Sequence, residues 1–335
     1  MDKKFQLKRK HHHIWAHYLK HWSLDDLNVW YTTKKGNYRC DSVYGLAAER
    51  DFYKINFLND EDVRFIRNFS SKSPDELRQI HNGYLNDFCI ASRAAKLAET
   101  MQPPEHIKQR LEAFQYNVLE NLHGSHETDV IEILACLNRG DISVFETSES
   151  RVKFKQFFAM QMTRTKSFKK KAMSFAVDRE SFERHPNPPF SFETYSQLME
   201  KNWWFLSYMF GMNIGANLTA TQHDDKQVLL INETSQPFIT SDNPIINVHE
   251  SMKKIPEGQA PQYMDAFYPL SPKYAYMINN SDRYPSGKVS ITRDEALVFN
   301  VEMAARAEEH LFAQTESQLK EVKRLCRERS KKPRM

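Results

Sequence analysis

Glycine is scarce in this chain, with nine residues in 335, and the glycine-rich motifs that bind phosphates or nucleotides are missing. The sequence contains no GxxxxGK, GxGxxG or GxSxG pattern. Each of these motifs needs glycine because the backbone must turn sharply or approach a ligand closely. Their absence argues against P-loop NTPases, Rossmann dehydrogenases and ordinary α/β-hydrolases.

Cysteine and long apolar runs are also scarce. Cys40, Cys89, Cys136 and Cys326 lie far apart and form no C-x-x-C pair, which disfavours a disulfide framework and a cysteine-based zinc site. The N-terminus carries charge and histidine where a secretory signal needs an apolar run. The longest charge-free stretch, residues 202–223, contains asparagine, glutamine and glycine, and predicts a buried helix. We therefore expect a cytoplasmic protein that does not enter a membrane.

Charge is nearly balanced overall but is unevenly distributed along the chain. The 47 basic and 43 acidic residues leave a net charge of only +4. Basic residues concentrate in three segments, at 3–10, 166–171 and 323–334. Such segments can guide a polyanion, so nucleic acid or a nucleotide is the expected partner.

The apolar periodicity changes along the chain and predicts an α+β fold. Three- and four-residue spacing indicates amphipathic helices at 106–122, 129–138, 151–163 and 192–210. Short β-branched or aromatic runs follow from about residue 227, and a hairpin surrounds Gly36. A last helix is expected from about Asn300, with Ala304, Ala307 and Leu311 on one face, and ends in the basic sequence KRLCRERSKKPRM.

We expect a single domain over residues 1–320, followed by a basic tail at 321–335. Its helical bundle covers about 60–215. An antiparallel sheet combines N- and C-terminal strands, at 24–56 and 227–299, and the C-terminal helix closes the fold.

Histidines gather in the segment KRKHHHIWAHYLKHWS, residues 8–23. His17 and His21 are four residues apart and could share a metal, but two ligands without a third are more typical of packing or surface positions. His11 and His12 precede the predicted helix, where side chains can converge on a pocket. They are candidates for general acid or base catalysis, and the alternative is a polar segment without chemistry.

A second candidate region is PFITSDNPIINV. Pro244 disfavours helix at Asn243, and the side chains of Ser241 and Asp242 can bond nearby backbone amides, so a tight turn alone explains this composition. The functional interpretation is that the strand end presents Asp242 as a base or metal ligand, with Ser241 and Asn243 binding substrate.

A third region places Gln161 and Arg164 on an otherwise apolar helical stripe. A buried guanidinium needs an anion, which is either a bound phosphate or a structural glutamate. The segment HGSHE, with His123, His126 and Glu127, lacks clear metal-ligand spacing and is predicted to be a loop between helices.

The chain resembles a widespread bacterial domain of unknown function that opens with His-His-x-x-Pro-x-x-Tyr-Leu and later carries Thr-Ser-Asp-Asn-Pro. The segment HHHIWAHYL matches the first motif, with Trp15 at the proline position, and FITSDNP matches the second completely. A middle motif, Gln-x-x-Arg-Thr-Pro, resembles QMTRTK, with Lys166 in place of proline. The resemblance extends from about residue 8 to 315. It favours a shared pocket of His11, His12, Gln161, Arg164 and Asp242, and the alternative is several independent structural motifs.

Two imidazoles, a carboxylate, an amide and an arginine suit the cleavage or transfer of a phosphate ester. We therefore expect a nucleic-acid or nucleotide phosphohydrolase, with a divalent metal ion as a compatible cofactor. The resemblance to bacterial accessory proteins extends this expectation to a toxin or phage-defence effector. The alternatives are a non-catalytic nucleic-acid-binding or adaptor protein and a small-molecule hydrolase unrelated to phosphate.

Overall fold

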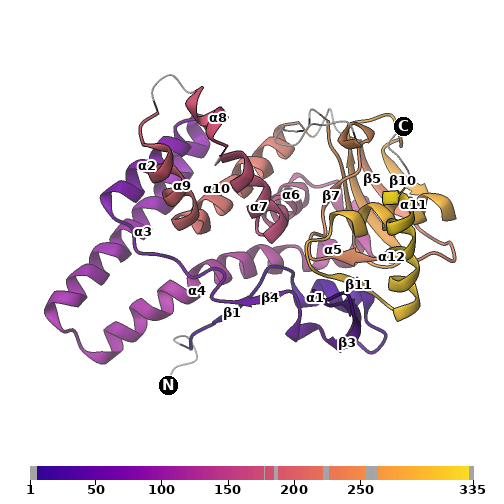
Figure 1. Cartoon of the computed structure of the whole chain (residues 1–335), viewed down its shortest axis with the longest axis horizontal. Coiled ribbons are helices and arrows are strands. Elements are labelled where there is room, and N and C mark those ends of the chain that lie inside the picture. The colour runs from indigo at the N-terminus through magenta and orange to yellow at the C-terminus, as the bar shows by residue number, and fades with distance from the viewer. Residues whose placement is uncertain are drawn as a thin grey trace.

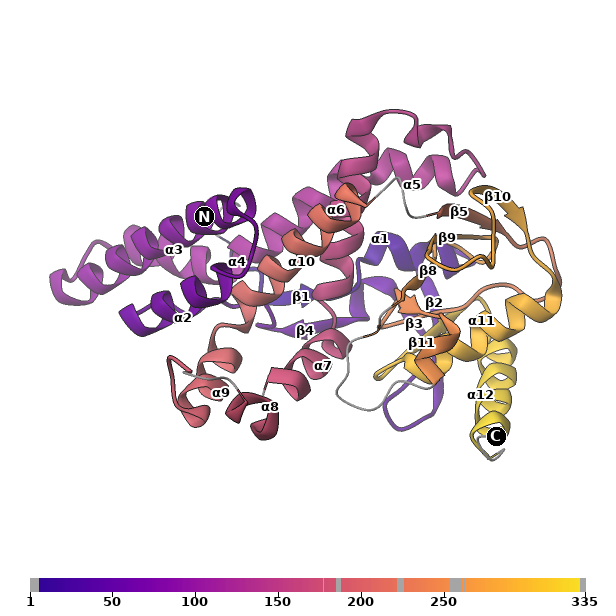
Figure 2. The same ribbon diagram turned by 90° about the horizontal axis from the view of Figure 1, so that it is seen from above.

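The computed structural model of the chain describes residues 6–176, 178–184, 188–221, 226–253, 261 and 263–331. The predicted α+β fold is confirmed. Long helices occupy one end of the molecule, and the strands gather at the other end with the last two helices beside them (Figure 1, Figure 2). The short strands at 10–12 and 48–50 lie between the two ends, and the N-terminal segment contacts both parts (Figure 1).

The helical part is built around two helices that pack closely along their length, α6 and α10. Gly211 and Gly215 of α10 leave no room for a Cβ atom, because Met160 and Gln156 of α6 occupy that space. Apolar side chains from the surrounding helices complete this part of the core. The helices are α2 (Asp60–Ser70), α3 (Asp75–Met101), α4 (Glu105–Asp129), α5 (Ile131–Leu137), α6 (Ser148–Thr163), α7 (Lys166–Ala176), α8 (Arg179–Glu183), α9 (Phe192–Lys201) and α10 (Trp203–Ala220).

A four-stranded antiparallel sheet joins the two ends of the chain, as predicted. Its strand order is β3-β2-β11-β6. Its members are β2 (Asn28–Thr32), β3 (Tyr38–Ser42), β6 (Thr240–Ser241) and β11 (Leu311–Ala313). A separate two-stranded sheet pairs β1 (Lys10–His12) with β4 (Ala48–Arg50), and the short helix α1 (Ala16–Leu19) follows β1.

The remaining strands form a second, five-stranded sheet in the order β10-β5-β9-β8-β7. The described strands therefore form three sheets, where the sequence predicted one. The edge pair of β10 and β5 is parallel, and the other pairs are antiparallel. The strands are β5 (Lys226–Ile231), β7 (Ile246–Asn247), β8 (Asp265–Pro269), β9 (Tyr274–Asn279) and β10 (Gly287–Ser290).

The prediction of one helix from about Asn300 into the basic C-terminal sequence is wrong, because the chain leaves a first helix, forms β11 and then begins a second helix. The helix α11 (Arg293–Arg306) begins at a capping box, in which the Thr292 and Glu295 side chains each accept the other residue's backbone N–H. It ends at Arg306, and Leu311 belongs to β11. The predicted basic tail is helical as far as Lys331, within α12 (Glu316–Lys331), and residues 332–335 lie outside the described part of the chain.

Most of the charge-free stretch at 202–223 forms α10, which is largely buried, and residues 222–223 lie outside the described part of the chain. Among the residues that the structure describes, no helix combines the length and the apolar character needed to cross a bilayer.

Candidate functional site

The first motif histidine, His11, is fully buried in β1. Its Nδ1 accepts the backbone N–H of Tyr53 at 2.7 Å, and its Nε2 donates to the carbonyl oxygen of Tyr116 at 2.8 Å. The proton must be on Nε2 because a carbonyl oxygen only accepts. Both ring nitrogens are therefore engaged by the backbone, and His11 anchors β1 to its neighbours.

His12 is half-buried and extends toward α4. Its Nδ1 lies 3.8 Å from Oε1 of Glu120, and its Nε2 lies 3.4 Å from the carbonyl oxygen of Tyr44. These long contacts hold the ring loosely. Its catalytic role stays a prediction.

Gln161 and Arg164 form a buried chain of hydrogen bonds behind the His-rich segment. Gln161 Nε2 donates to the carbonyl oxygen of His13 at 3.1 Å, and Arg164 Nε donates to Gln161 Oε1 at 3.1 Å. Arg164 Nη1 donates to Glu127 Oε1 at 2.7 Å. The guanidinium therefore has a structural glutamate, which is one of the two alternatives that a buried arginine predicts. These hydrogen bonds position the backbone of His13.

Asp242 accepts the backbone N–H groups of three consecutive residues after α11. Its Oδ1 is 2.9 Å from the nitrogen of Glu308, and its Oδ2 is 2.6 and 3.0 Å from those of Glu309 and His310. Burial raises the pKa of the Asp242 carboxyl above its usual range, although these hydrogen bonds oppose the shift. Asp242 thus holds the segment at 307–310 in place.

The neighbours of Asp242 support the same segment. Ser241 Oγ donates to the carbonyl oxygen of Asn243 at 2.9 Å, which closes the predicted tight turn. Asn243 Nδ2 donates to the carbonyl oxygen of Arg306 at 3.1 Å, where α11 ends. Ser241 and Asn243 therefore act on the backbone, and their substrate-binding role is untested.

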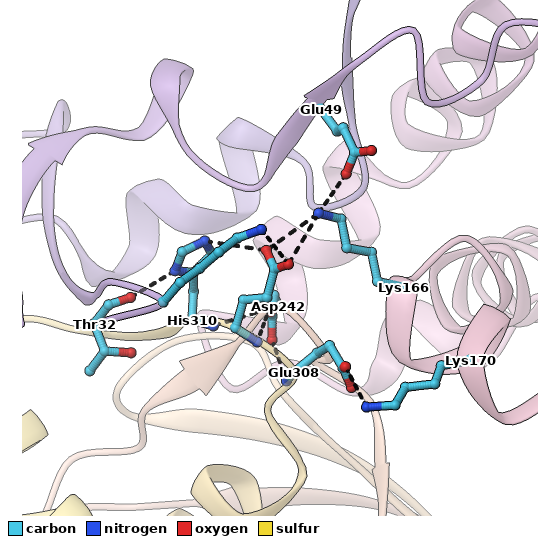
Figure 3. Close-up of polar contacts among 9 residues, drawn as sticks. Thr32, Glu49, Lys166, Lys170, Asp242, Glu308 and His310 are labelled. Atoms are coloured by element: carbon cyan, nitrogen blue, oxygen red, sulfur yellow. Dashed lines mark hydrogen bonds and ion pairs between the residues drawn. The ribbon is translucent and has the colours of Figure 1, made fainter. Parts of the chain in front are cut away.

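In front of these motif residues lies a pocket of about 310 Å³. It is lined by His13, Lys34, Ala47, Ala48, Glu49, Lys166, Glu309 and His310. The side chains come from the N-terminal segment, the hairpin between β2 and β3, β4, the start of α7 and the segment after α11 (Figure 3). The three motifs therefore support one pocket through the residues next to them in the chain.

His13 is the least satisfied polar side chain of this pocket. Only 2% of its surface is exposed, and neither ring nitrogen has a hydrogen-bond partner within the described part of the chain. Burial, followed by the positive charges of Lys166 and Arg164, lowers the pKa of His13 to about 3. The imidazole is therefore neutral at pH 7, and both of its nitrogens are buried without a hydrogen bond to any described residue.

A second imidazole, His310, is held in one tautomer. Its Nδ1 lies 2.7 Å from the carbonyl oxygen of Thr32, so Nδ1 carries a proton and donates it (Figure 3). The other nitrogen, Nε2, lies 3.7 Å from Oε2 of Glu309. This orientation is typical of catalytic histidines that are fixed through one ring nitrogen.

Two lysines face two glutamates across the same pocket. Lys166 Nζ lies 2.5 Å from Glu49 Oε2 and 3.3 Å from Glu309 Oε2 (Figure 3). Lys34 Nζ lies 2.6 Å from Glu309 Oε1. Burial lowers the pKa of Lys166, but its two carboxylate partners outweigh burial and raise it. Lys166 is therefore a fixed positive charge beside His13.

The metal sites considered from the sequence have no ligand set among the described residues. Within the described residues, no group of three or more His, Cys, Asp or Glu side chains is arranged to hold a metal ion. The rings of His17 and His21 contact edge to face at 5.9 Å, and His21 Nε2 lies 3.3 Å from Asn138 Nδ2. This pair therefore has the packing role that was the alternative to metal binding.

The prediction of a loop at HGSHE is wrong. His123, His126 and Glu127 lie inside α4, which continues to Asp129. The glycine and serine of this segment weaken helix propensity, but packing against α6 and α10 decides the conformation. Glu127 is the partner of Arg164, and His126 Nε2 lies 3.0 Å from the hydroxyl of Tyr208.

The sequence interpretation missed most of the pocket itself. His13 is the third histidine of HHH, and Lys166 is the residue at the family's proline position. Both lie close in sequence to predicted site residues, so proximity to a motif was the signal that could have identified them. Lys34, Glu49, Glu309 and His310 belong to no motif, and nothing in the linear pattern marks them.

The chain belongs to a family described as a protein of unknown function (DUF4238), whose profile matches residues 10–317. The match covers most of the chain and confirms the expected class of domain, although it does not test the individual motifs. No curated protein matches the chain, and no solved structure does.

Proposed function

We propose that the pocket cleaves or transfers phosphate esters in nucleic acids or nucleotides, with His13 and His310 as its acid and base. The observation that carries this proposal is the His13 ring. It is buried at the wall of the pocket, has no hydrogen-bond partner among the described residues, and lies beside a fixed positive charge. A buried polar group without a partner costs stability, which is typical of functional positions.

Lys166 and Lys34 would hold the phosphate oxygens. Lys166 is now paired with Glu49, whose side chain is 48% exposed. A partly exposed ion pair of this kind contributes only about 0 to 1 kcal/mol, so a phosphate can replace Glu49 at little cost. The ammonium groups would then stabilise the charge that develops on phosphorus oxygens in the transition state.

The two imidazoles would move the protons. Neutral His13 takes a proton from the attacking hydroxyl or water as the oxygen of that group bonds to phosphorus, and the P–O bond to the leaving oxygen breaks. His310, whose Nδ1 is fixed by Thr32, would supply the proton to that leaving oxygen from Nε2. A bound phosphate offsets the positive charge of Lys166, so it raises the pKa of His13 and strengthens this base when substrate is present.

In this proposal, His13 and His310 take the catalytic roles that the sequence predicted for His11 and Asp242. His11 has backbone partners on both ring nitrogens, and Asp242 accepts three backbone N–H groups. Both become positioning residues for the pocket. A divalent metal ion remains part of the proposal only as a companion of the bound phosphate.

The test is cleavage of end-labelled single- and double-stranded RNA and DNA, with a nucleotide panel, in Mg²⁺, Mn²⁺, Zn²⁺ or EDTA. We expect His13→Ala and His310→Ala to lower turnover by about 10²- to 10⁴-fold, the usual contribution of a positioned acid or base. His17→Ala is the matched control, since His17 is exposed on α1 and outside the pocket. Equal turnover by His13→Ala and wild type would refute the proposal.

A second candidate is a non-catalytic nucleic-acid-binding or adaptor protein. It is favoured by the observation that Arg164, Asp242 and His11 all have structural partners. Binding without turnover of any substrate would support it.

The proposed setting is the bacterial cytoplasm, where the chain would act as a toxin or phage-defence effector. All four cysteines lie in the described residues, and none forms a disulfide there, as a reducing compartment favours. Induced expression should arrest bacterial growth with the wild type and not with His13→Ala. If both proteins arrest growth, then growth arrest does not depend on the pocket.

A further inference from the structure

A basic strip leads from the pocket across the β2–β3 hairpin to α12. We call it the hairpin–helix strip and define it by Lys35, Tyr38, Lys320, Lys323 and Arg327. The helix α12 packs against β2 and β3, and Figure 2 shows it beside this hairpin. The turn carries Lys34 and Lys35 at its tip and closes at Gly36, whose φ of +84° suits glycine.

The strip begins at the proposed acid. Thr32 of β2, whose carbonyl oxygen accepts from His310, lies directly opposite Tyr38 of β3 in the antiparallel register. Opposite residues of neighbouring strands have Cα atoms about 5 Å apart. A strand of nucleic acid with one phosphate at His310 therefore reaches Tyr38 within a few nucleotides.

An aromatic ring with two ammonium groups lies at the centre of the strip. The Nζ atoms of Lys320 and Lys323 are each 5.7 Å from the centroid of the Tyr38 ring. Aromatic rings among cations are typical of proteins that bind single-stranded nucleic acid, because bases stack on the ring while phosphates meet the cations. An acidic peptide has no base to stack.

Lys320 of the strip pairs with Glu316 at 2.8 Å, but the other two cations on α12 are not neutralised in this way. Lys323 and Arg327 are one helical turn apart on α12, and neither has a carboxylate partner among the residues that the structure describes. Like charges at this spacing destabilise a helix. Burial, followed by the charge of Arg327, lowers the pKa of Lys323. A bound phosphate would relieve this repulsion.

Most described cations of the other two predicted basic segments have a carboxylate partner. Lys166, Lys169 and Lys170 pair with glutamates, as Figure 3 shows for Lys170 and Glu308. Arg9 pairs with Asp51. Residues 3–5 and 332–334 lie outside the described part of the chain. Lys323 and Arg327 differ from these residues because no carboxylate of the described chain neutralises them.

We infer that the hairpin–helix strip binds single-stranded nucleic acid and directs it into the pocket, so that the substrate is a polymer and not a free nucleotide. This inference rests on the proposed function for the identity of the pocket end. The binding surface itself can be tested without turnover.

The experiment measures fluorescence anisotropy of a labelled 12-nucleotide RNA on the full-length protein at several salt concentrations. Lys323→Glu/Arg327→Glu should weaken binding about tenfold or more, and Lys323→Gln/Arg327→Gln should lower the salt slope by about 1.4, or 0.7 for each lost phosphate contact. Arg93→Glu/Lys96→Glu is the matched control on α3, at the opposite end of the molecule (Figure 1), and should bind like the wild type. Circular dichroism melting confirms folding of each variant.

Equal binding by the strip variants and the control pair would overturn the inference, as would wild type that binds no RNA. Polyglutamate that competes as well as RNA would also overturn it, because the strip would then bind any polyanion. A different result would contradict the proposed function. If the wild type binds RNA through the strip but cleaves nothing, then the strip is an RNA-binding surface, and His13 and His310 are not catalytic.

Discussion

Asp242 and His310 are joined by two reciprocal contacts. The backbone N–H of His310 donates to Asp242 Oδ2, and the backbone N–H of Asp242 donates to the carbonyl oxygen of His310, both at 3.0 Å. Asp242 thus fixes the backbone of His310, while the carbonyl oxygen of Thr32 fixes its ring. The Thr-Ser-Asp-Asn-Pro motif therefore acts on the pocket through a residue 68 positions away.

Replacing Asp242 by Ala should loosen the segment at 307–310. The substitution removes one acceptor from three backbone N–H groups, and hydrogen bonds to a charged group contribute about 1.5 to 3 kcal/mol each before compensation by water. We expect the free energy of unfolding to fall by about 3 kcal/mol in urea titrations. Asp282→Ala, which removes an exposed carboxylate paired with Lys226, should leave it nearly unchanged. Equal stability of the two variants would contradict the positioning role.

Replacing His13 by Leu should stabilise the protein while it abolishes turnover. The leucine fills a similar volume and removes two buried nitrogens that have no partner in the described chain, a gain of about 1 kcal/mol. His11→Leu is the contrasting control. It leaves the N–H of Tyr53 and the carbonyl oxygen of Tyr116 without their partner, and should destabilise by about 2 kcal/mol. A destabilised His13→Leu would argue for a structural His13.

The buried His13 also predicts a loss of stability in acid. Its pKa is about 3 in the folded protein and 6.5 in the unfolded chain. The unfolded state therefore gains a proton below pH 6.5 that the folded state cannot accept until about pH 3. Stability from this group is complete above pH 6.5 and is lost as the pH falls through that window.

The measurement compares urea titrations at pH 7 and pH 5. The wild type should lose about 2 kcal/mol more than His13→Leu over this interval. Other histidines with lowered pKa, such as His21, contribute equally to both proteins and cancel in the difference. Parallel losses in the two proteins would show that His13 is not held neutral.

The pair of Arg164 and Glu127 should show strong coupling. Arg164→Met leaves Glu127 buried without its cation, which typically costs about 3 to 5 kcal/mol. The double variant Arg164→Met/Glu127→Leu should recover a large part of this loss, because neither charge remains. A double-mutant cycle by urea unfolding measures the coupling. Additive losses would mean that the two side chains act independently.

Sequence patterns predicted the fold class well and the element boundaries less well. Apolar periodicity located the helices and the sheet that joins both ends of the chain. It failed at HGSHE, where tertiary packing overrides weak helix propensity, and after Arg306, where the chain turns to form β11. Apolar periodicity also could not predict that β10 and β5 pair in parallel, because strand direction depends on how the chain returns to the sheet.

The sequence by itself determined the family and the three motifs that support the pocket. Only the tertiary structure decided which side chains face that pocket, because His13, Lys34, Glu49, Lys166, Glu309 and His310 come from five separate segments. It also decided that His11, Arg164 and Asp242 are satisfied by partners. The physical reason is that a polar side chain acts according to its burial and its hydrogen-bond partners, and both are properties of residues that are distant in the chain.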